Sequence, residues 1–337
     1  MKALAASLGD PAGIGPELLC EAWAARKDAG LMPFFAVGGE HLLAAAAARR
    51  GVDTPIIAIA DPADAADAFS EGLPVLGEAD GDYFPGEPSP DGARLAFSSL
   101  SDAARLAVAG KAAGIVTGPI SKALLSEVGF TFPGQTEFVA DASAIAADDA
   151  VMMLAGPQLR TVPLTVHCAL SEVPGRLSRA LIVGKARIVA RALARDFGLE
   201  NPRLAIAALN PHAGEGGKFG DEEQRIIAPA IEELRAEGID ATGPHPADAL
   251  FAPHERGRFD VALCMYHDQA LIPLKALDFD NGVNVTLGLP IIRTSPDHGT
   301  AFGIAGKRIA NPGATIAAIR MAGECAARRA ANAPAHA

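Results

Sequence analysis

The feature that most limits what this chain can fold into is an alternation of two patterns that runs along most of its length. Short apolar runs typical of buried strands alternate with longer segments whose apolar residues recur at helical spacing. The clearest pairs are residues 4–9 with 16–27, 34–39 with 40–50, 113–118 with 121–129, 204–210 with 221–238, and 260–268 with 269–277. Because helices that alternate with strands usually connect parallel neighbours, the sequence predicts an α/β fold with a mainly parallel sheet.

Residues 151–170 break this alternation. They form two apolar runs around Gly156 and Pro157, which predicts an antiparallel hairpin. A chain of 337 residues also exceeds the usual size of one hydrophobic core. Glycine- and proline-rich stretches at 132–135 and 287–290 suggest two crossings between domains. We therefore expect two α/β/α domains around a central cleft, one of residues 1–133 with 289–337 and one of residues 134–288.

Composition excludes several classes of function. The formal net charge of −11 argues against a nucleic-acid partner, because phosphate backbones require a basic surface. No apolar run approaches the ~20 residues of a membrane helix, and the first residues lack the long apolar stretch of a secretory signal. The four cysteines are scattered and include no C-x-x-C pair, so disulfides and zinc-thiolate sites are not expected. We expect a cytoplasmic protein that binds a small molecule.

Three histidines end or follow apolar runs, namely His167, His212 and His267. Neutral imidazole is the commonest metal-binding side chain, and rings from separate strand ends can converge at the edge of a sheet. Their positions are far apart and match no local metal motif, so an ordinary hydrogen-bonded role at each strand end stays open. Asp268 and Asp248 are candidates to orient these ligands or to join them.

A second group of polar residues lies near the end of the chain. Lys275, Asn284 and Arg293 stand between apolar runs. Two cations with an amide between them suit the binding of phosphate or carboxylate, although solvated surface charge remains the alternative for any one of them. Earlier, residues 117–122 and 134–140 place hydroxyl, amide and charged groups at helix starts, where simple capping is equally compatible.

Glycines mark two further loops. Residues 9–17, GDPAGIGPE, form a turn after the first strand but lack the third glycine of a dinucleotide fingerprint. A plain turn with Pro16 and Glu17 opening the next helix is an equal alternative. No Rossmann fingerprint follows any expected strand, so a nucleotide cofactor would need another loop. Residues 298–306, with several glycines, form a loop whose backbone can approach a flat ligand.

Taken together, these segments resemble the 4-hydroxythreonine-4-phosphate dehydrogenase family of vitamin B6 biosynthesis over nearly the whole chain. The segments that carry the resemblance are, in order, GDPAGIGPE, TGPISK, FPGQTEF, LNPHAGEGG, YHDQALIPLK, GVNVTLGLP and RTSPDHGTAF. The loop HGTAFGIAGKRIANP is also similar to the adenine-side cofactor loop of isopropylmalate and isocitrate dehydrogenases. The resemblance therefore implies an isopropylmalate dehydrogenase-like fold, which has no Rossmann fingerprint.

The resemblance also implies roles for particular residues. His167, His212 and His267 would bind one divalent metal, zinc, cobalt, manganese or magnesium, with one histidine coming from the partner subunit of a homodimer. The residues implied to bind substrate are Gln135, Thr136, Lys275, Asn284 and Arg293. Those implied to bind NAD or NADP are His298, Gly299, Thr300 and Gly303. Lys275, Asp268 and Asp248 are candidates for proton transfer, and nothing in the sequence chooses among them.

The implied reaction oxidises 4-phosphooxy-L-threonine and decarboxylates the product to 3-amino-2-oxopropyl phosphate. Two departures from the family pattern bear on it. Gln135 stands where the family usually has histidine, and Gly303 where it generally has aspartate. The first leaves open a phosphorylated sugar acid of the phosphoerythronate or phosphothreonate type, or a cyclic dihydrodiol acid, as substrate. The second leaves the choice between NAD and NADP open, and a non-catalytic binding protein is a further alternative.

Overall fold

Residues 2–332 are described by a computed structural model, in which the chain divides into two compact units. The first contains residues 2–150 together with 289–327, and the second contains residues 151–288 and 328–332. Residues 134–150 thus pack with the first unit, whereas the sequence placed them in the second. The reason is apolar burial, because Val139 and Ala140 join the core cluster that includes Leu100.

The first unit is built on a parallel sheet with the strand order β3-β4-β2-β1-β5-β12. Its strands are β1 (Leu4–Ser7), β2 (Phe34–Val37), β3 (Ile56–Ile59), β4 (Leu73–Leu76), β5 (Ile115–Val116) and β12 (Arg293–Pro296). Strands β1 and β2 are buried along their whole length. Their apolar runs do not alternate with polar residues because helices cover both faces of the sheet.

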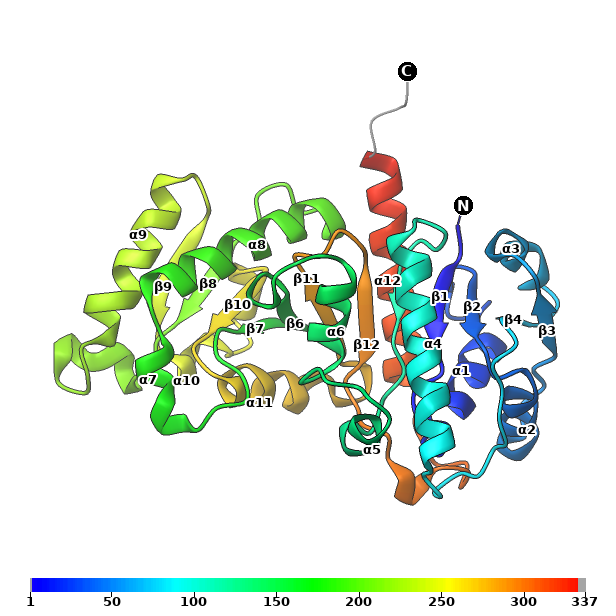
Figure 1. Ribbon diagram of the computed structural model, residues 1–337. Helices are drawn as coiled ribbons and strands as arrows, with labels where there is room; N and C mark the ends of the chain where they lie inside the picture. Colours follow the sequence, from blue (N-terminus) through cyan, green and yellow to red (C-terminus); the bar gives the residue numbers. More distant parts are fainter. Residues whose placement is uncertain (1, 333–337) are drawn as a thin grey trace. The chain divides into compact units, whose positions relative to one another are not determined.

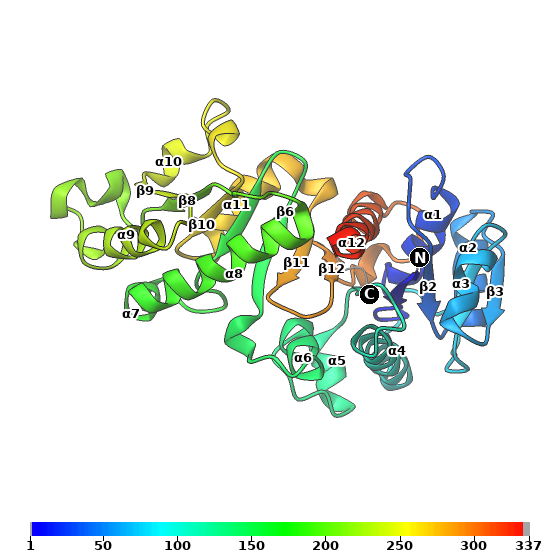
Figure 2. The same cartoon turned by 90° about the horizontal axis from the view of Figure 1, so that it is seen from above.

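Helices α4 and α12 lie on opposite faces of this sheet (Figures 1 and 2). The helices that begin in this unit are α1 (Gly15–Ala24), α2 (Glu40–Arg50), α3 (Ala65–Ala68), α4 (Pro90–Val108), α5 (Lys122–Glu127), α6 (Gln135–Ala142) and α12 (Gly313–Asn332), with 3₁₀ turns at Pro62–Asp64, Ala147–Asp149 and Phe302–Ile304. Ser89 starts the long helix α4 by accepting a hydrogen bond from the backbone N–H of Gly92 at 3.1 Å.

The second unit has a mixed sheet with the order β11-β6-β7-β10-β8-β9. Its strands are β6 (Val151–Ala155), β7 (Arg160–Pro163), β8 (Leu204–Ala207), β9 (Ala241–His245), β10 (Val261–Cys264) and β11 (Val283–Leu287). Strands β6 and β7 are antiparallel, with Leu154 opposite Thr161, so the predicted hairpin is confirmed. Strand β11 is antiparallel to β6, and the pairs from β7 to β9 are parallel. The predicted α/β class is confirmed in both units.

Helices α8 and α11 cover opposite faces of the second sheet (Figures 1 and 2). The α-helices here are α7 (Val173–Arg176), α8 (Arg179–Phe197), α9 (Ala228–Ala236), α10 (Ala247–Leu250) and α11 (His267–Asp278). Shorter turns lie at Leu170–Glu172, Pro211–Gly217, Arg256–Arg258 and Phe279–Asn281, and a π-helical turn at Glu223–Ile227 precedes α9. Between residues 2 and 332, no helix has the length and apolar character needed to cross a membrane.

The parallel part of this sheet determines where the candidate metal ligands lie. Strands β7, β10 and β8 are neighbours and run in the same direction. Their carboxyl ends therefore meet at one edge, which is where open α/β sheets bind ligands. His167 follows β7, His267 is the first residue of α11 after β10, and His212 follows β8.

Candidate functional site

His167 and His267 form a pair at this edge of the second unit. Their ring centroids are 6.0 Å apart and their planes are inclined by 40°. Together with Cys168, Tyr266 and Asp268 they line a cavity of about 270 Å³. An Asp268 carboxylate oxygen lies 2.8 Å from Nδ1 of His267. A carboxylate at one ring nitrogen fixes the orientation of an imidazole and leaves the other nitrogen for a metal.

His212 lies in a turn with unusual backbone geometry. It is one of five consecutive residues, 212–216, that all have positive φ angles, with 52° at His212 itself. The buried carboxylate of Glu223 supports this turn by accepting the N–H groups of Leu209 at 2.9 Å and Asn210 at 2.8 Å. His167 also has a positive φ, of 41°. Left-handed backbone at residues other than glycine is strained and clusters at functional positions, so two of the three predicted ligands carry this signature.

A single chain does not bring all three histidines together. In the part of the chain that the structure describes, no group of three histidine, cysteine, aspartate or glutamate side chains is arranged to hold a metal. The ring of His212 instead lies 6.3 Å from the ring of Phe219. Asp248 is exposed on α10 and does not line the cavity of the histidine pair. The pair and its orienting carboxylate suit a divalent cation, but they supply only two of the nitrogen ligands such a site needs.

A buried guanidinium forms the centre of a separate site in the first unit. Arg293, on β12, is only 4% exposed. Its Nη2 donates to Thr117 Oγ1 at 2.9 Å and to Gln135 Oε1 at 3.1 Å, and its Nη1 donates to Thr136 Oγ1 at 3.4 Å. These three acceptors come from the end of β5 and the first turn of α6. Neutral acceptors fix the guanidinium without cancelling its charge, which suits an anion receptor.

Gln135 is engaged at both ends of its amide. Its Nε2 donates to the carbonyl of Gly118 at 2.8 Å while its Oε1 accepts from Arg293. Burial lowers the pKa of Arg293 to about 10, and the Glu137 carboxylate opposes this effect. Arg293 therefore remains protonated at neutral pH. The geometry indicates that Gln135 positions Arg293, and leaves Arg293 and Thr136 as the groups that suit direct contact with an anion.

The two other predicted substrate residues belong to the second unit. Asn284 lies on β11, and its side-chain oxygen is buried with no hydrogen-bond partner among residues 2–332. A buried acceptor without a donor is costly, so it marks a place where a ligand donor would be stabilised. Lys275 lies in the last turn of α11, partly buried, two helical turns beyond Asp268.

The predicted cofactor loop packs against the first turn of the chain. The carbonyl of Thr300 accepts the N–H of Ile14 at 3.0 Å. A Cβ at Gly13 would lie 2.7 Å from that carbonyl, so this turn requires glycine for close approach and not for a nucleotide fingerprint. His298 Nδ1 lies 3.1 Å from the carbonyl of Gly299, and its Nε2 lies 3.5 Å from Thr315 Oγ1.

Two residues at these sites were not identified as candidates from the sequence. Thr117 was visible only as part of the TGPISK segment after a strand, and Glu17 only as an acidic residue that opens a helix. Thr117 holds Arg293, and Glu17 is fully buried against the cofactor loop, where it accepts the N–H of Gly306 at 3.1 Å. A buried acidic residue in a first helical turn cannot be told from an exposed one by sequence alone.

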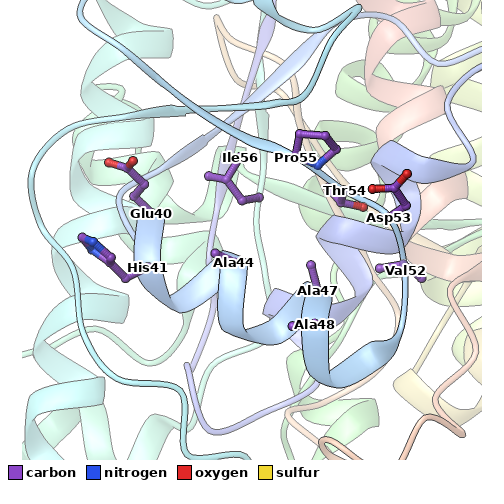
Figure 3. A pocket seen from close by; sticks show the side chains of 10 residues that line it. All are labelled: Glu40, His41, Ala44, Ala47, Ala48, Val52, Asp53, Thr54, Pro55 and Ile56. Carbon is purple, nitrogen blue, oxygen red and sulfur yellow. The ribbon is translucent and has the colours of Figure 1, made fainter.

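A larger depression in the first unit is unrelated to these residues. Helix α2 and the segment before β3 enclose about 430 Å³, with Glu40 and His41 at one end and Asp53 and Thr54 at the other (Figure 3). Its floor contains alanines of α2, and none of the predicted site residues lines it. The candidate site is therefore defined by its chemistry and not by the size of its hollow.

These features define a class of protein: an α/β protein of two units with an oriented imidazole pair, a buried guanidinium and a glycine-containing loop at residues 298–306. Residues 31–322 match the family described as "Pyridoxal phosphate biosynthetic protein PdxA". Because that match spans most of the chain, this protein belongs to the PdxA family. The resemblance inferred from the sequence motifs is confirmed.

Individual relatives agree with this assignment. The chain is 66% identical over 327 residues to the 4-hydroxythreonine-4-phosphate dehydrogenase of Erythrobacter litoralis, with 97% of each chain covered. Its fold matches the crystal structure of the Klebsiella pneumoniae enzyme of that name with a TM-score of 0.85 at 38% identity, covering 96% of this chain and 98% of that one. A terephthalate 1,2-cis-dihydrodiol dehydrogenase from Burkholderia xenovorans matches with a TM-score of 0.66 at 28% identity, covering 96% and 98%.

The environment of His298 leads to a prediction about pH. Burial is the main cause that lowers the pKa of His298 below its ordinary value, although the Gly299 carbonyl and Asp297 oppose it. When the pH falls through the ordinary histidine pKa, the unfolded chain takes up a proton that the native chain resists, so stability is lost. We expect His298→Asn to lose less unfolding free energy than the wild type between about pH 7.5 and about pH 5.5.

Chemical denaturation at both pH values measures this difference. His254→Asn is the matched control, because His254 is largely exposed and pairs only with neighbouring Glu255. The control should keep the wild-type dependence on pH. Equal losses in wild type and His298→Asn would show that the native His298 titrates like an exposed histidine.

Proposed function

We propose that this protein is a metal-dependent oxidoreductase that uses NAD or NADP to oxidise 4-phosphooxy-L-threonine and decarboxylates the product to 3-amino-2-oxopropyl phosphate. The reaction would belong to pyridoxal phosphate biosynthesis in the cytoplasm. The observation that carries the proposal is the buried guanidinium of Arg293, oriented by neutral acceptors, in a chain that also orients a histidine pair. The high identity to named relatives over the whole chain supports it.

Each group has a distinct task in this proposal. A divalent cation, when bound, would supply polarisation of the substrate hydroxyl and of the carbonyl that replaces it. His167 and His267 would hold that cation, and Asp268 keeps the ring of His267 in place. Asp268 would serve to orient His267, and Asp248 is exposed on α10. Lys275, partly buried in the last turn of α11, is proposed as the group that receives the hydroxyl proton.

Substrate recognition would rest on charge and on hydrogen bonds. Arg293 and Thr136 would bind the anionic end of the substrate, while Thr117 and Gln135 hold the guanidinium in place. The unpartnered oxygen of Asn284 would accept a hydrogen bond from a substrate donor such as its ammonium group.

Two other substrate classes follow from the same fold. A phosphorylated sugar acid or a cyclic dihydrodiol acid was suggested by glutamine at position 135, and the likeness to the Burkholderia xenovorans enzyme favours considering the second. Because both ends of the Gln135 amide are occupied within the protein, its identity bears less directly on substrate choice. A non-catalytic binding protein is disfavoured, since such a protein has no need of an oriented histidine pair.

Activity measurements test this proposal. The purified, metal-loaded protein should reduce NAD or NADP when 4-phosphooxy-L-threonine is added. Arg293→Lys should lower kcat/KM by about tenfold or more, because lysine keeps the charge but cannot make the planar set of bonds. Arg94→Lys on the exposed face of α4 is the control and should be unaffected. Turnover with sugar acids or dihydrodiol acids alone would show that the proposed substrate is wrong. Absence of any reduction of NAD or NADP would contradict the proposed activity itself.

We further propose a homodimer in which one chain completes the metal site of the other. Large apolar side chains are exposed on the second unit: Leu170 (66%), Phe219 (50%), Ile272 (65%) and Phe279 (71%). Leu170 lines the cavity of the histidine pair, and exposed apolar groups beside an incomplete site suit burial by another chain. In this arrangement His167 and His267 would act within one chain and His212 would act across the interface.

Mixing two inactive variants tests the shared site. His167→Ala and His212→Ala should each abolish metal-dependent activity as homodimers. In a mixed dimer one site lacks both residues and the other retains all three, so co-refolding should restore about half of the activity per mixed dimer. No recovery, with heterodimer formation verified by differently tagged chains, would show that the three ligands do not divide in this way.

The choice of cofactor is proposed to depend on position 303. A Cβ at Gly303 would meet no atom within 4 Å, and its φ is not in the left-handed region. Aspartate therefore fits there without strain and would bind the ribose hydroxyls of NAD while repelling the extra phosphate of NADP. Gly303→Asp should raise the ratio of kcat/KM for NAD over NADP by about tenfold.

Steady-state kinetics with both cofactors provides this measurement. Gly257→Asp is the matched control, because Gly257 also has open space at its Cβ but lies in the turn Arg256–Arg258 of the second unit. The ratio should not change in the control. An unchanged ratio in Gly303→Asp would remove the loop of residues 298–306 from cofactor discrimination.

A further inference from the structure

The second half of the cofactor loop and the residues after it, 301–310 in all, pack against α1 and α2. Ala305 and Ala310 pack with Ile14 and Leu18 in a small buried cluster separate from the main core. Gly306 has a φ of 68°, and a Cβ there would lie 2.5 Å from Arg49 Nε. The left-handed backbone at Gly306 favours glycine, and a Cβ there would also meet Pro85 at 2.7 Å. We call residues 301–310 the seated segment.

Charged side chains form hydrogen bonds with the backbone of the seated segment. Glu17, fully buried on α1, accepts the N–H of Gly306 at 3.1 Å. Arg49 and Arg50 end α2, and they donate to the carbonyls of Gly306 at 3.2 Å and of Ala310 at 2.6 Å. Hydrogen bonds that involve charged groups are stronger than neutral ones, so these contacts determine where the segment lies.

Glu17 and Arg50 are arranged in a way that stability alone does not explain. Oε1 of Glu17 lies 3.7 Å from Nη1 of Arg50, with side-chain exposures of 0% and 7%. Neither atom has a hydrogen-bond partner among residues 2–332. Glu21 accepts from Arg50 Nε at 2.7 Å and thereby holds the guanidinium beside Glu17. Buried polar atoms without hydrogen bonds lower stability, and a buried ion pair rarely offsets its own desolvation.

We propose that Glu17 and Arg50 are positioning residues for the nicotinamide cofactor. They would act through the backbone of the seated segment, whose position they fix at Gly306 and Ala310, and so determine where residues 298–303 can meet the nucleotide. This inference rests on the proposed function, in which that loop binds NAD or NADP.

Substitutions that preserve the fold test this role. Arg50→Lys keeps the charge beside Glu17 but loses the second N–H that reaches Ala310, and Glu17→Gln keeps an acceptor for Gly306 but removes the charge. Each should raise the dissociation constant of NADH or NADPH, measured by fluorescence titration, by about tenfold, corresponding to one charge-assisted hydrogen bond. The KM for the phosphorylated substrate should stay within about twofold.

Hydrogen exchange gives a second measurement. In the wild type, NADH or NADPH should slow exchange of the amides in residues 301–310, and this protection should be reduced in both variants. Asp196→Asn is the matched control, since Asp196 is another buried carboxylate held by arginines, Arg195 and Arg329. It should lower the melting temperature without changing cofactor affinity.

The outcomes separate the two proposals. Folded Arg50→Lys and Glu17→Gln that bind the cofactor as the wild type does would overturn the positioning role and leave the proposed function intact. An equal loss of affinity in Asp196→Asn would also overturn it, because general destabilisation would then be sufficient. A wild type that binds neither NADH nor NADPH would overturn the proposed function and this assignment with it.

Discussion

Parallel pairing of neighbouring strands is the constraint from which both candidate sites follow. Strands that run together end together, so side chains that follow them meet although they are far apart in the sequence. In the second unit this brings His167 and His267 to one edge. In the first unit β5 and β12 are also parallel neighbours, and Arg293, which begins β12 opposite Ile115, reaches Thr117 just beyond the end of β5. The chemistry of each site is thus a consequence of strand order.

Much of the fold was accessible from the sequence because burial leaves a simple pattern. Strands covered on both faces have unbroken apolar runs, and this identified β1, β2 and β10 as well as the two strands of the hairpin. The first domain crossing was misplaced for a related reason. Residues 132–135 have the composition of a linker, but the apolar residues Val139 and Ala140 that follow belong to the core of the first unit. Composition predicts where the chain turns. Which unit a short helix belongs to depends on the apolar core against which it packs.

The site was predictable in its residue types and only partly in its geometry. Histidines at strand ends indicated a metal site, and one pair does meet. Sequence patterns could not show that His212 lies in a left-handed turn supported by Glu223, because backbone strain of this kind depends on contacts between distant residues. The role of Gln135 was equally hidden, since the two ends of its amide are satisfied by a carbonyl and a guanidinium from other elements. Hydrogen-bond partners of this kind become visible only in three dimensions.

Gly303 differs from Gly13 and Gly306 in a way that matters for how the protein can change. Gly13 and Gly306 are constrained by atoms within 3 Å, so any substitution there must displace backbone or side chains. Gly303 faces open space on the same loop. A single codon change could therefore introduce a charged side chain at position 303 without displacing other atoms. The preference for NAD or NADP could evolve in this way while the remaining contacts of the loop are kept.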